Sequence, residues 1–160
     1  MSIFTIGNDT LSIYRIFANL HTNLAPFFLN AGTISYLKNV SVLKPIASSI
    51  FINQPSTYDY LIYDQLFVSP ITDNSTNIKL HIPGLKTQTW IYWFNNTIKF
   101  NGGEVVSSFE CQYNEFPLFI LAGSILPLKV NNGHTSLGTS ASKDYITVMI
   151  ARPEKESECS

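Results

Sequence analysis

The sequence predicts a mainly β protein with an N-terminal helical segment, in which the strands form an antiparallel sandwich or barrel. Apolar residues recur at spacings of three and four in the first part of the chain, the period of an amphipathic helix. From residue 58 onward they alternate with period two, as in half-buried strands. Short runs rich in Asn, Gly, Pro and Ser separate the strands at roughly ten-residue intervals, which is typical of all-β domains.

Residues 10–37 are predicted to be helical. Thr10 or Asp9 can cap the start, and Gly32 is expected to end the main body. Pro26 should kink this segment or divide it in two, because proline lacks the amide hydrogen that a helix interior needs. The apolar stripe consists of Ile13, Phe17, Leu20, Leu24, Phe27 and Phe28.

The β-branched run "NVSVLKPIA" (39–47) predicts a single strand after the helix. A lone helix and strand placed before a sandwich usually belong to a larger α/β layer structure. The remaining predicted strands are residues 58–71, 77–84, 89–95, 103–110, 116–121 and 145–152. The charged tail "PEKESECS" (153–160) is predicted to be disordered.

The apolar run "EFPLFILAGSILPL" (115–128) is too short for a transmembrane helix, which needs about 20 residues. It also contains Gly123 and two prolines, which disfavour a helix. A buried pair of strands with a turn at residues 122–124 fits the run better. We therefore predict no membrane span.

Composition limits the classes of partner. The 160 residues carry a net charge of −1, so there is no basic field to attract nucleic acid or anionic lipid. Charged residues make up 13% of the chain, about half the usual share. This indicates a surface that something else covers, although an AT-rich genome favouring Phe, Ile, Asn and Tyr would give the same composition.

Four Asn-X-Ser/Thr sequons begin at Asn8, Asn39, Asn74 and Asn95 and are candidate N-glycosylation sites. About two or three such sequons would arise by chance in a chain this rich in Asn, Ser and Thr, so the four sequons are weak evidence for secretion. The start "MSIFTIGNDT" does not have the pattern of a signal peptide. Two cysteines, at 111 and 159, are expected to be free thiols or to form a dispensable bridge.

Catalytic, cofactor-binding and metal-binding residues are not predicted. Asp59 and Asp64 alternate onto opposite faces of a strand region, and the remaining candidate carboxylates lie singly around turns, at Glu104, Glu110 and Glu115. His21, His81 and His134 lack metal-ligand spacing, and Ser124 lacks the context of a nucleophile elbow.

Trp90 and Trp93 are the candidates for stacking on a sugar ring, in a cluster with Tyr92 and Phe94. Because residues alternate between the two faces of a strand, half of this cluster must point inward. Core packing is therefore the alternative to sugar binding.

Six segments, in this order, resemble glycoside hydrolase family 31, the α-glucosidase and sucrase-isomaltase family. "YRIFANLHTNLAPFFLNAG" (14–32) is similar to its last barrel helix and "VSVLKPIA" (40–47) to its final barrel strand. The other four are "YLIYDQLFVSPI" (60–71), "IKLHIPGLKTQTWIYWFNN" (78–96), "NGG" (101–103) and "FPLFILAGSILPL" (116–128), which resemble the β-domain that follows. The pattern is broken at Lys44 and Leu121, where the family has Arg, and at Tyr63, where it has Gly.

The resemblance implies that residues 1–48 are the last helix and strand of a (β/α)8 barrel, that 49–152 are a β-sandwich and that 153–160 are a tail. The parent enzyme would hydrolyse α-glucosides with retention, using two carboxylates that the family places upstream of this helix. The chain would then be inactive alone. It would be either a truncated, non-functional product or half of a divided enzyme that assembles with the missing barrel half as a partner chain. The alternatives are a non-catalytic structural or carbohydrate-binding sandwich module and an unrelated small β-protein. The family also implies a secretory or lysosome-like compartment.

Overall fold

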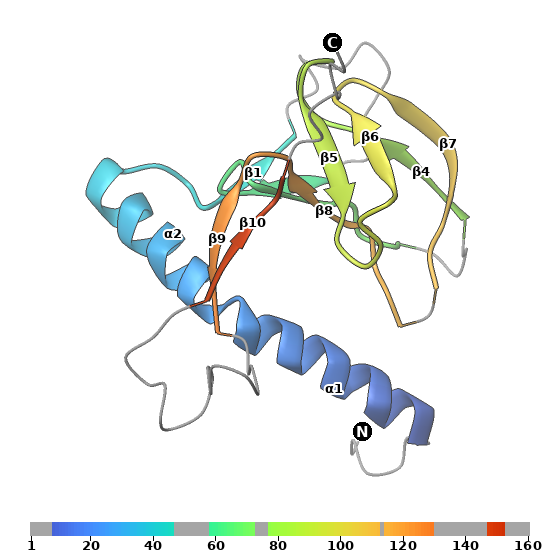
Figure 1. Ribbon diagram of the computed structural model, residues 1–160, viewed down its shortest axis with the longest axis horizontal. Coiled ribbons are helices and arrows are strands. Elements are labelled where there is room, and N and C mark those ends of the chain that lie inside the picture. Colours follow the sequence, from blue (N-terminus) through green and yellow to red (C-terminus); the bar gives the residue numbers. More distant parts are fainter. Residues whose placement is uncertain (1–7, 47–57, 73–76, 113, 130–146, 153–160) are drawn as a thin grey trace, which may run out of the picture. The chain divides into compact units, whose positions relative to one another are not determined.

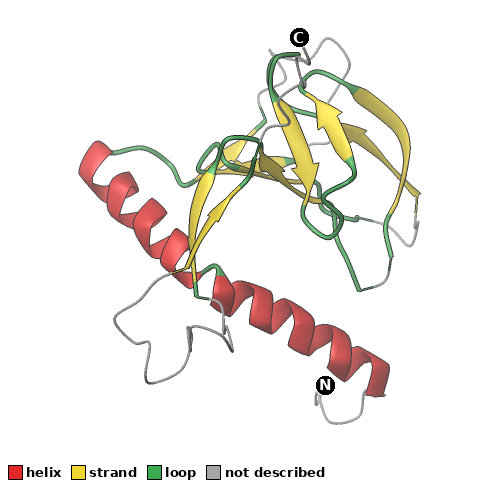
Figure 2. Cartoon of the chain, viewed as in Figure 1, coloured by secondary structure: helices red, strands yellow, loops and turns green. Residues whose placement is uncertain are grey.

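A computed structural model describes residues 8–46, 58–72, 77–112, 114–129 and 147–152 (Figures 1 and 2). These residues form two helices followed by ten strands. The chain divides into two compact units. The first comprises Met1–Val40 and Leu126–Met149, and the second Ser41–Ile125 and Ile150–Ser160.

Two helices make up most of the described part of the first unit: α1 (Asn8–Asn23) and α2 (Ala25–Lys38). Their division confirms the predicted effect of Pro26, which lies in the first turn of α2, where a missing amide hydrogen costs nothing. Gly32, however, does not end the helix. The chain stays helical to Lys38 and stops where Asn39 adopts the left-handed conformation, φ 50° and ψ 45°.

The predicted apolar stripe on the helices is the inward face. Leu24 and Phe27 are buried, and the other four members are half-buried. A second apolar set on α2 faces outward, with Leu29, Tyr36 and Leu37 exposing 73%, 87% and 73% of their surfaces. Positions 29, 36 and 37 share one helical face, because seven and eight residues span about two turns.

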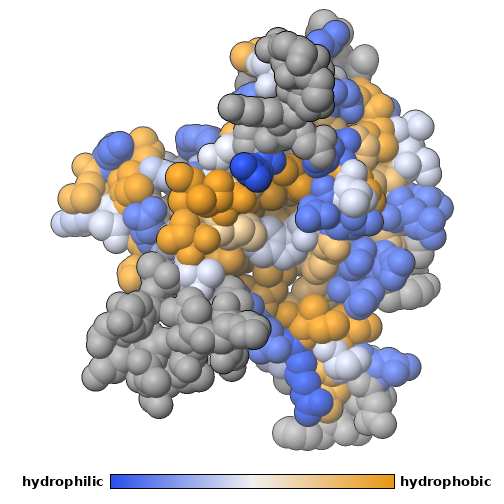
Figure 3. Space-filling model, viewed as in Figure 1, coloured by the Kyte–Doolittle hydropathy of each residue, from blue (hydrophilic) through white to orange (hydrophobic). Residues whose placement is uncertain are grey.

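Strands β9 (Ile125–Leu128) and β10 (Thr147–Ile150) form a two-stranded sheet. The backbone amide of Lys129, just after β9, donates to the Asn23 carbonyl at the end of α1 (2.8 Å). Leu126 and Leu128 are buried, whereas the sheet also carries three exposed apolar side chains: Ile125, Val148 and Ile150. Figure 3 shows apolar surface over the part of the molecule where Figure 1 draws β9 and β10.

The second unit contains a six-stranded antiparallel sheet in the order β1-β2-β3-β8-β5-β6. Its strands are β1 (Leu43–Pro45), β2 (Tyr60–Ile62), β3 (Leu66–Val68), β5 (Thr89–Tyr92), β6 (Lys99–Asn101) and β8 (Leu118–Leu121). A separate antiparallel pair is formed by β4 (Asn77–His81) and β7 (Val105–Glu110). The register of this pair shifts between Ile78 and Leu80, where Lys79 faces two residues of β7, as in a β-bulge.

The core of the second unit lies between these two sheets, which makes it a β-sandwich. Phe119 is its centre, with ring centroids 5.6 Å from Phe67, 5.3 Å from Tyr92 and 5.6 Å from Phe109. Aromatic rings at these separations pack edge-to-face or offset and add to the burial energy. The buried members of the cluster are Phe67, Leu80, Ile82, Trp90, Tyr92, Phe109, Cys111 and Phe119.

Two strand predictions need correction. Residues 58–71 form a hairpin rather than one strand, because Tyr63 and Asp64 adopt φ 50° and 57° and the Gln65 amide donates to the Ile62 carbonyl. A type I′ turn requires positive φ at both central residues, which Asn-Gly pairs usually supply. Strands β8 and β9 do not pair with each other, since β3 and β5 already occupy both edges of β8. Strand β6 was not predicted.

Candidate functional site

The two tryptophans differ in accessibility. Trp90 is only 2% exposed, packs edge-on against Phe67 at 5.9 Å and donates its indole N–H to the Pro83 carbonyl at 2.8 Å. Its ring faces are therefore occupied by the core. Trp93 is half-buried on the opposite side of the chain and lies outside the core cluster. Of the two candidates for sugar stacking, Trp93 is the accessible one.

Apart from Glu110, the described carboxylates of the second unit each have a partner other than a carboxylate. Asp59 is 2% exposed and accepts a hydrogen bond from the Ser69 hydroxyl at 2.7 Å. Asp64 forms an exposed ion pair with Lys44. The partner of Glu104 is Asn101, at 2.8 Å, and that of Glu115 is Tyr92, while Glu110 is exposed at the end of β7. Nothing in these contacts sets up the acid-and-nucleophile pair that a retaining glycosidase requires.

Tyr92, Cys111 and Glu115 form a polar cluster at the side of the aromatic core. The Tyr92 hydroxyl donates to Glu115 Oε2 at 2.9 Å and lies 3.8 Å from Cys111 Sγ. Burial, together with the Glu115 hydrogen bond, raises the pKa of Tyr92 far above its usual value. Burial also raises the pKa of the Cys111 thiol, so this cysteine is a protonated core residue and not a nucleophile.

Histidines provide no metal centre in the described residues, where no group of three His, Cys, Asp or Glu side chains could hold an ion. His21 is exposed on α1, with its ring 5.6 Å from that of Phe28. His81 is 5% exposed, and neither of its ring nitrogens has a hydrogen-bond partner. Burial and the charge of Lys79 lower the pKa of His81, which favours the neutral ring. His134 lies outside the described residues.

Two sequon asparagines have described side chains. Asn39 is exposed at the C-terminal end of α2, and Asn95 is exposed at the end of β5. Asn8 begins α1, but its side chain is not among those described, and Asn74 lies outside the described residues. The tail and Cys159 lie outside them as well.

Sequence reasoning missed the buried Asp59–Ser69 pair and the Lys44–Asp64 ion pair, which link residues ten and twenty positions apart. Two residues at or beside the second pair depart from the family pattern. Lys44 and Tyr63 both stand where the family pattern has other residues, and Tyr63 takes a positive φ where that pattern has glycine.

Comparison with known proteins identifies the family of this chain. The sequence model of the glycosyl hydrolase family 31 C-terminal domain matches residues 40–126, more than half of the chain. The chain belongs to glycoside hydrolase family 31. The matched residues coincide within one position at each end with the segment Ser41–Ile125 of the second unit. The family 31 region is therefore the β-sandwich described above.

Relatives of this family 31 chain are much longer than it is. An isomaltosyltransferase of Sporosarcina globispora is 24% identical over 141 residues, covering 84% of this chain and 12% of the relative. A family 31 dextranase of Flavobacterium johnsoniae complexed with glucose has a TM-score of 0.71 at 18% identity, covering 92% of this chain and 18% of the dextranase. The chain thus spans less than a fifth of either protein.

A cycloalternan-forming enzyme of Listeria monocytogenes, in complex with a pentasaccharide substrate, has a TM-score of 0.73 at 20% identity. It matches 91% of this chain and 14% of its own length. At these identities the structural likeness establishes the fold of the family 31 region. In the part of the chain that the structure describes, neither helix is long and apolar enough to cross a membrane.

Proposed function

We propose that this chain is the C-terminal region of a family 31 glycoside hydrolase, in which residues 49–152 form the β-sandwich and residues 1–48 supply the last helix and strand of the (β/α)8 barrel. That last strand would be β1, which in this chain pairs with β2 at the edge of the six-stranded sheet. The observation that carries the proposal is the match of the family's C-terminal domain to the sandwich unit. In this role the sandwich supports the barrel, and the catalytic carboxylates come from elsewhere.

The parent activity that we infer is retaining hydrolysis of α-linked glucosides. Support comes from the compared proteins, which include a dextranase complexed with glucose and an isomaltosyltransferase. The chain alone is expected to be inactive, because a retaining mechanism needs two carboxyl groups about 5–5.5 Å apart. The described carboxylates of the sandwich are instead engaged by serine, lysine, asparagine and tyrosine, or are exposed at a strand end.

The partner that we propose is the missing barrel half, present as a separate chain. The outward apolar face of α2, formed by Leu29, Tyr36 and Leu37, supports this part of the proposal. Three large apolar side chains on one exposed helical face are costly in water and are typical of surfaces that another protein covers. Carbohydrate would then be the substrate of the assembled enzyme.

Sedimentation, with an α-glucosidase assay on each fraction, tests the proposal. The chain is compared alone and in an extract of its source cells, with a chromogenic α-glucoside as substrate. We expect the purified chain to be inactive and the chain in extract to sediment with a larger protein and with activity. A Leu29→Ser, Tyr36→Ser double variant should lose that association, whereas Thr33→Ser, on the same helical face, should keep it. If the chain in the extract sedimented as an inactive monomer, the proposed association with a partner chain would be refuted.

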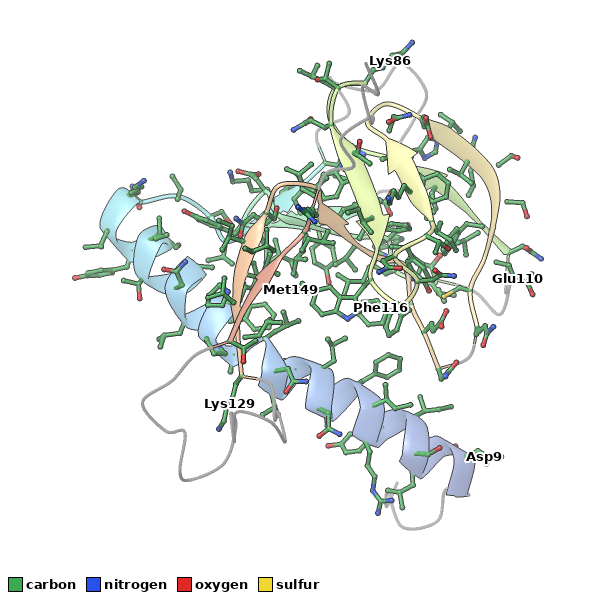
Figure 4. The ribbon with its side chains drawn as sticks, viewed as in Figure 1. Asp9, Lys86, Glu110, Phe116, Lys129 and Met149 are labelled. Carbon is green, nitrogen blue, oxygen red and sulfur yellow. The ribbon has the colours of Figure 1, made fainter. Side chains whose placement is uncertain are left out.

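That refuting outcome would favour the second candidate, a non-catalytic sandwich module that is structural or binds carbohydrate. Trp93, the more accessible of the two tryptophans, supports this candidate, because the part of its half-buried indole that reaches solvent can stack on a sugar ring. Phe94, the next residue in the chain, packs its ring against that of Phe116, with ring centroids 5.7 Å apart (Figure 4 labels Phe116). Titration with maltooligosaccharides should then quench tryptophan fluorescence, and Trp93→Ala should abolish the quenching.

A further inference from the structure

The connection between β5 and β6 contains the sequon Asn95-Asn96-Thr97, and all three side chains are exposed. The connection is a tight turn, since the Ile98 amide donates to the Asn95 carbonyl at 3.1 Å and the Tyr92 amide to the Ile98 carbonyl at 3.0 Å. Because backbone hydrogen bonds hold the turn at its base, a large group attached to its tip does not disturb the strands.

The hydrogen bonds within the sequon use only the oxygen of the Asn95 side-chain amide. The Asn95 Oδ1 oxygen accepts hydrogen bonds from the Thr97 hydroxyl at 2.7 Å and from the Thr97 backbone amide at 3.1 Å. Within the described residues, Asn95 Nδ2 makes no hydrogen bond. This nitrogen is the atom to which N-linked sugars are attached, and it belongs to an exposed residue.

The other described sequon differs at its hydroxyl. Ser41, the third residue of the Asn39 sequon, donates its hydroxyl to the Leu43 carbonyl at the start of β1 and is not directed to Asn39. Asn39 itself stabilises the end of α2 through its left-handed backbone. Of these two sequons, only that of Asn95 combines an exposed turn with a hydroxyl directed to its own asparagine.

We propose that Asn95 carries an N-linked oligosaccharide, independently of the family 31 function. The donor would be an oligosaccharide attached to a polyprenyl pyrophosphate. Asn95 Nδ2 forms a bond to C1 of the first sugar, the bond from C1 to the pyrophosphate oxygen breaks, and the polyprenyl pyrophosphate leaves. The proton lost from Nδ2 passes to a base of the transferase.

Such a glycan would have a physical role at this position. Strand β6 ends the described six-stranded sheet, so one of its edges has no strand partner among the described residues. Unpaired sheet edges invite association with other chains. A bulky, hydrated oligosaccharide on the turn that leads into β6 would cover this edge and solvate a chain with few charges.

Expression of the full chain behind a cleavable secretory leader in eukaryotic cells tests the proposal. Peptide-N-glycosidase digestion in heavy-oxygen water converts a glycosylated asparagine to labelled aspartate, which peptide mass spectrometry locates. We expect the label at Asn95 in the secreted chain or, if secretion fails, in the chain from microsomes, because transfer occurs in that compartment.

Variants separate the sequon from the turn. Asn95→Gln and Thr97→Ala should each lose one glycan-sized step in gel mobility, whereas Thr97→Ser and the neighbouring Asn96→Gln should keep it. Recovery of the unlabelled Asn95 peptide from the unsubstituted chain would overturn the proposal, whether or not another sequon is labelled. So would a mobility step that persists in Asn95→Gln and disappears in a variant of a different sequon.

Discussion

Replacing Gly102 by alanine tests the close backbone approach on which the sandwich loops depend. A Cβ atom at this position would lie 2.3 Å from the Leu85 carbonyl oxygen and 2.8 Å from the Gly84 carbonyl carbon, both backbone atoms that cannot rotate away. Ordinary contact begins at 3.4 Å, so the loop must move by about 1 Å. That movement would break the hydrogen bonds from the Gly102 amide to the Gln88 carbonyl and from the Gly103 amide to the Ile82 carbonyl, both 2.8 Å.

The expected cost is about 4 kcal/mol, from about 1–3 kcal/mol of overpacking and about 1 kcal/mol for each lost hydrogen bond. Two other glycines provide matched controls, because an added Cβ would meet nothing within 4 Å at either. Gly123 has φ 88°, so alanine there should cost about 1–2 kcal/mol of backbone strain alone. Gly32 lies inside α2, where alanine should stabilise by about 1 kcal/mol.

Urea unfolding measures all three variants. Both tryptophans lie in the second unit, so their fluorescence reports Gly102→Ala and Gly123→Ala, and the far-ultraviolet helix signal reports Gly32→Ala. The predicted order of stability is Gly32→Ala above the unsubstituted chain, then Gly123→Ala, then Gly102→Ala. If Gly102→Ala cost no more than Gly123→Ala, the loop contact at Leu85 would not be as close as described.

Three further predictions concern buried polar groups. Because the pKa of His81 is lowered in the folded chain, the unfolded chain binds more protons at acidic pH. The free energy of unfolding should therefore fall as pH drops below about 6.5. In urea unfolding at a series of pH values, His81→Gln should reduce this fall. The raised pKa values of Cys111 and Tyr92 act in the opposite direction. The contribution of each group to stability is fully present below its unfolded pKa, about 9 for Cys111 and about 10 for Tyr92, and is lost as pH rises further. The same titration of Tyr92→Phe should show a less steep loss of stability at high pH. Trp90→Phe should cost about 2–3 kcal/mol in urea unfolding, because a buried carbonyl loses its indole donor. A cost below about 0.5 kcal/mol would place Trp90 outside the core.

Sequence periodicity located most strands because their signal is local. Strand β8 was predicted from a continuous apolar run, and the structure explains that run: β8 is a central strand whose residues Leu118 to Ile120 are buried on both faces. The hairpin at Tyr63 and Asp64 was missed for an equally local reason. Its sequence lacks the Asn or Gly residues that usually announce positive φ, so nothing in the pattern divided residues 58–71.

The polar contacts of the sandwich could not be predicted from spacing. Tyr92 meets Glu115 across 23 positions, and Asp59 meets Ser69 only because β2 and β3 pair in one register. Such contacts depend on which strands become neighbours, and alternation does not determine strand order. Alternation did establish that Trp90 and Trp93 lie on opposite sides, but which side faces the core depends on the second sheet.

The low charge content of the chain has a structural counterpart in the central strands of the sandwich. The central strands β3, β8 and β5 are buried on both faces and so have almost no positions for polar residues. On α2, Leu29, Tyr36 and Leu37 share one face of the helix, while the buried Phe27 and Ala31 face inward. Two apolar faces on one helix support the proposed association, in which one face packs against this chain and the other against the proposed partner.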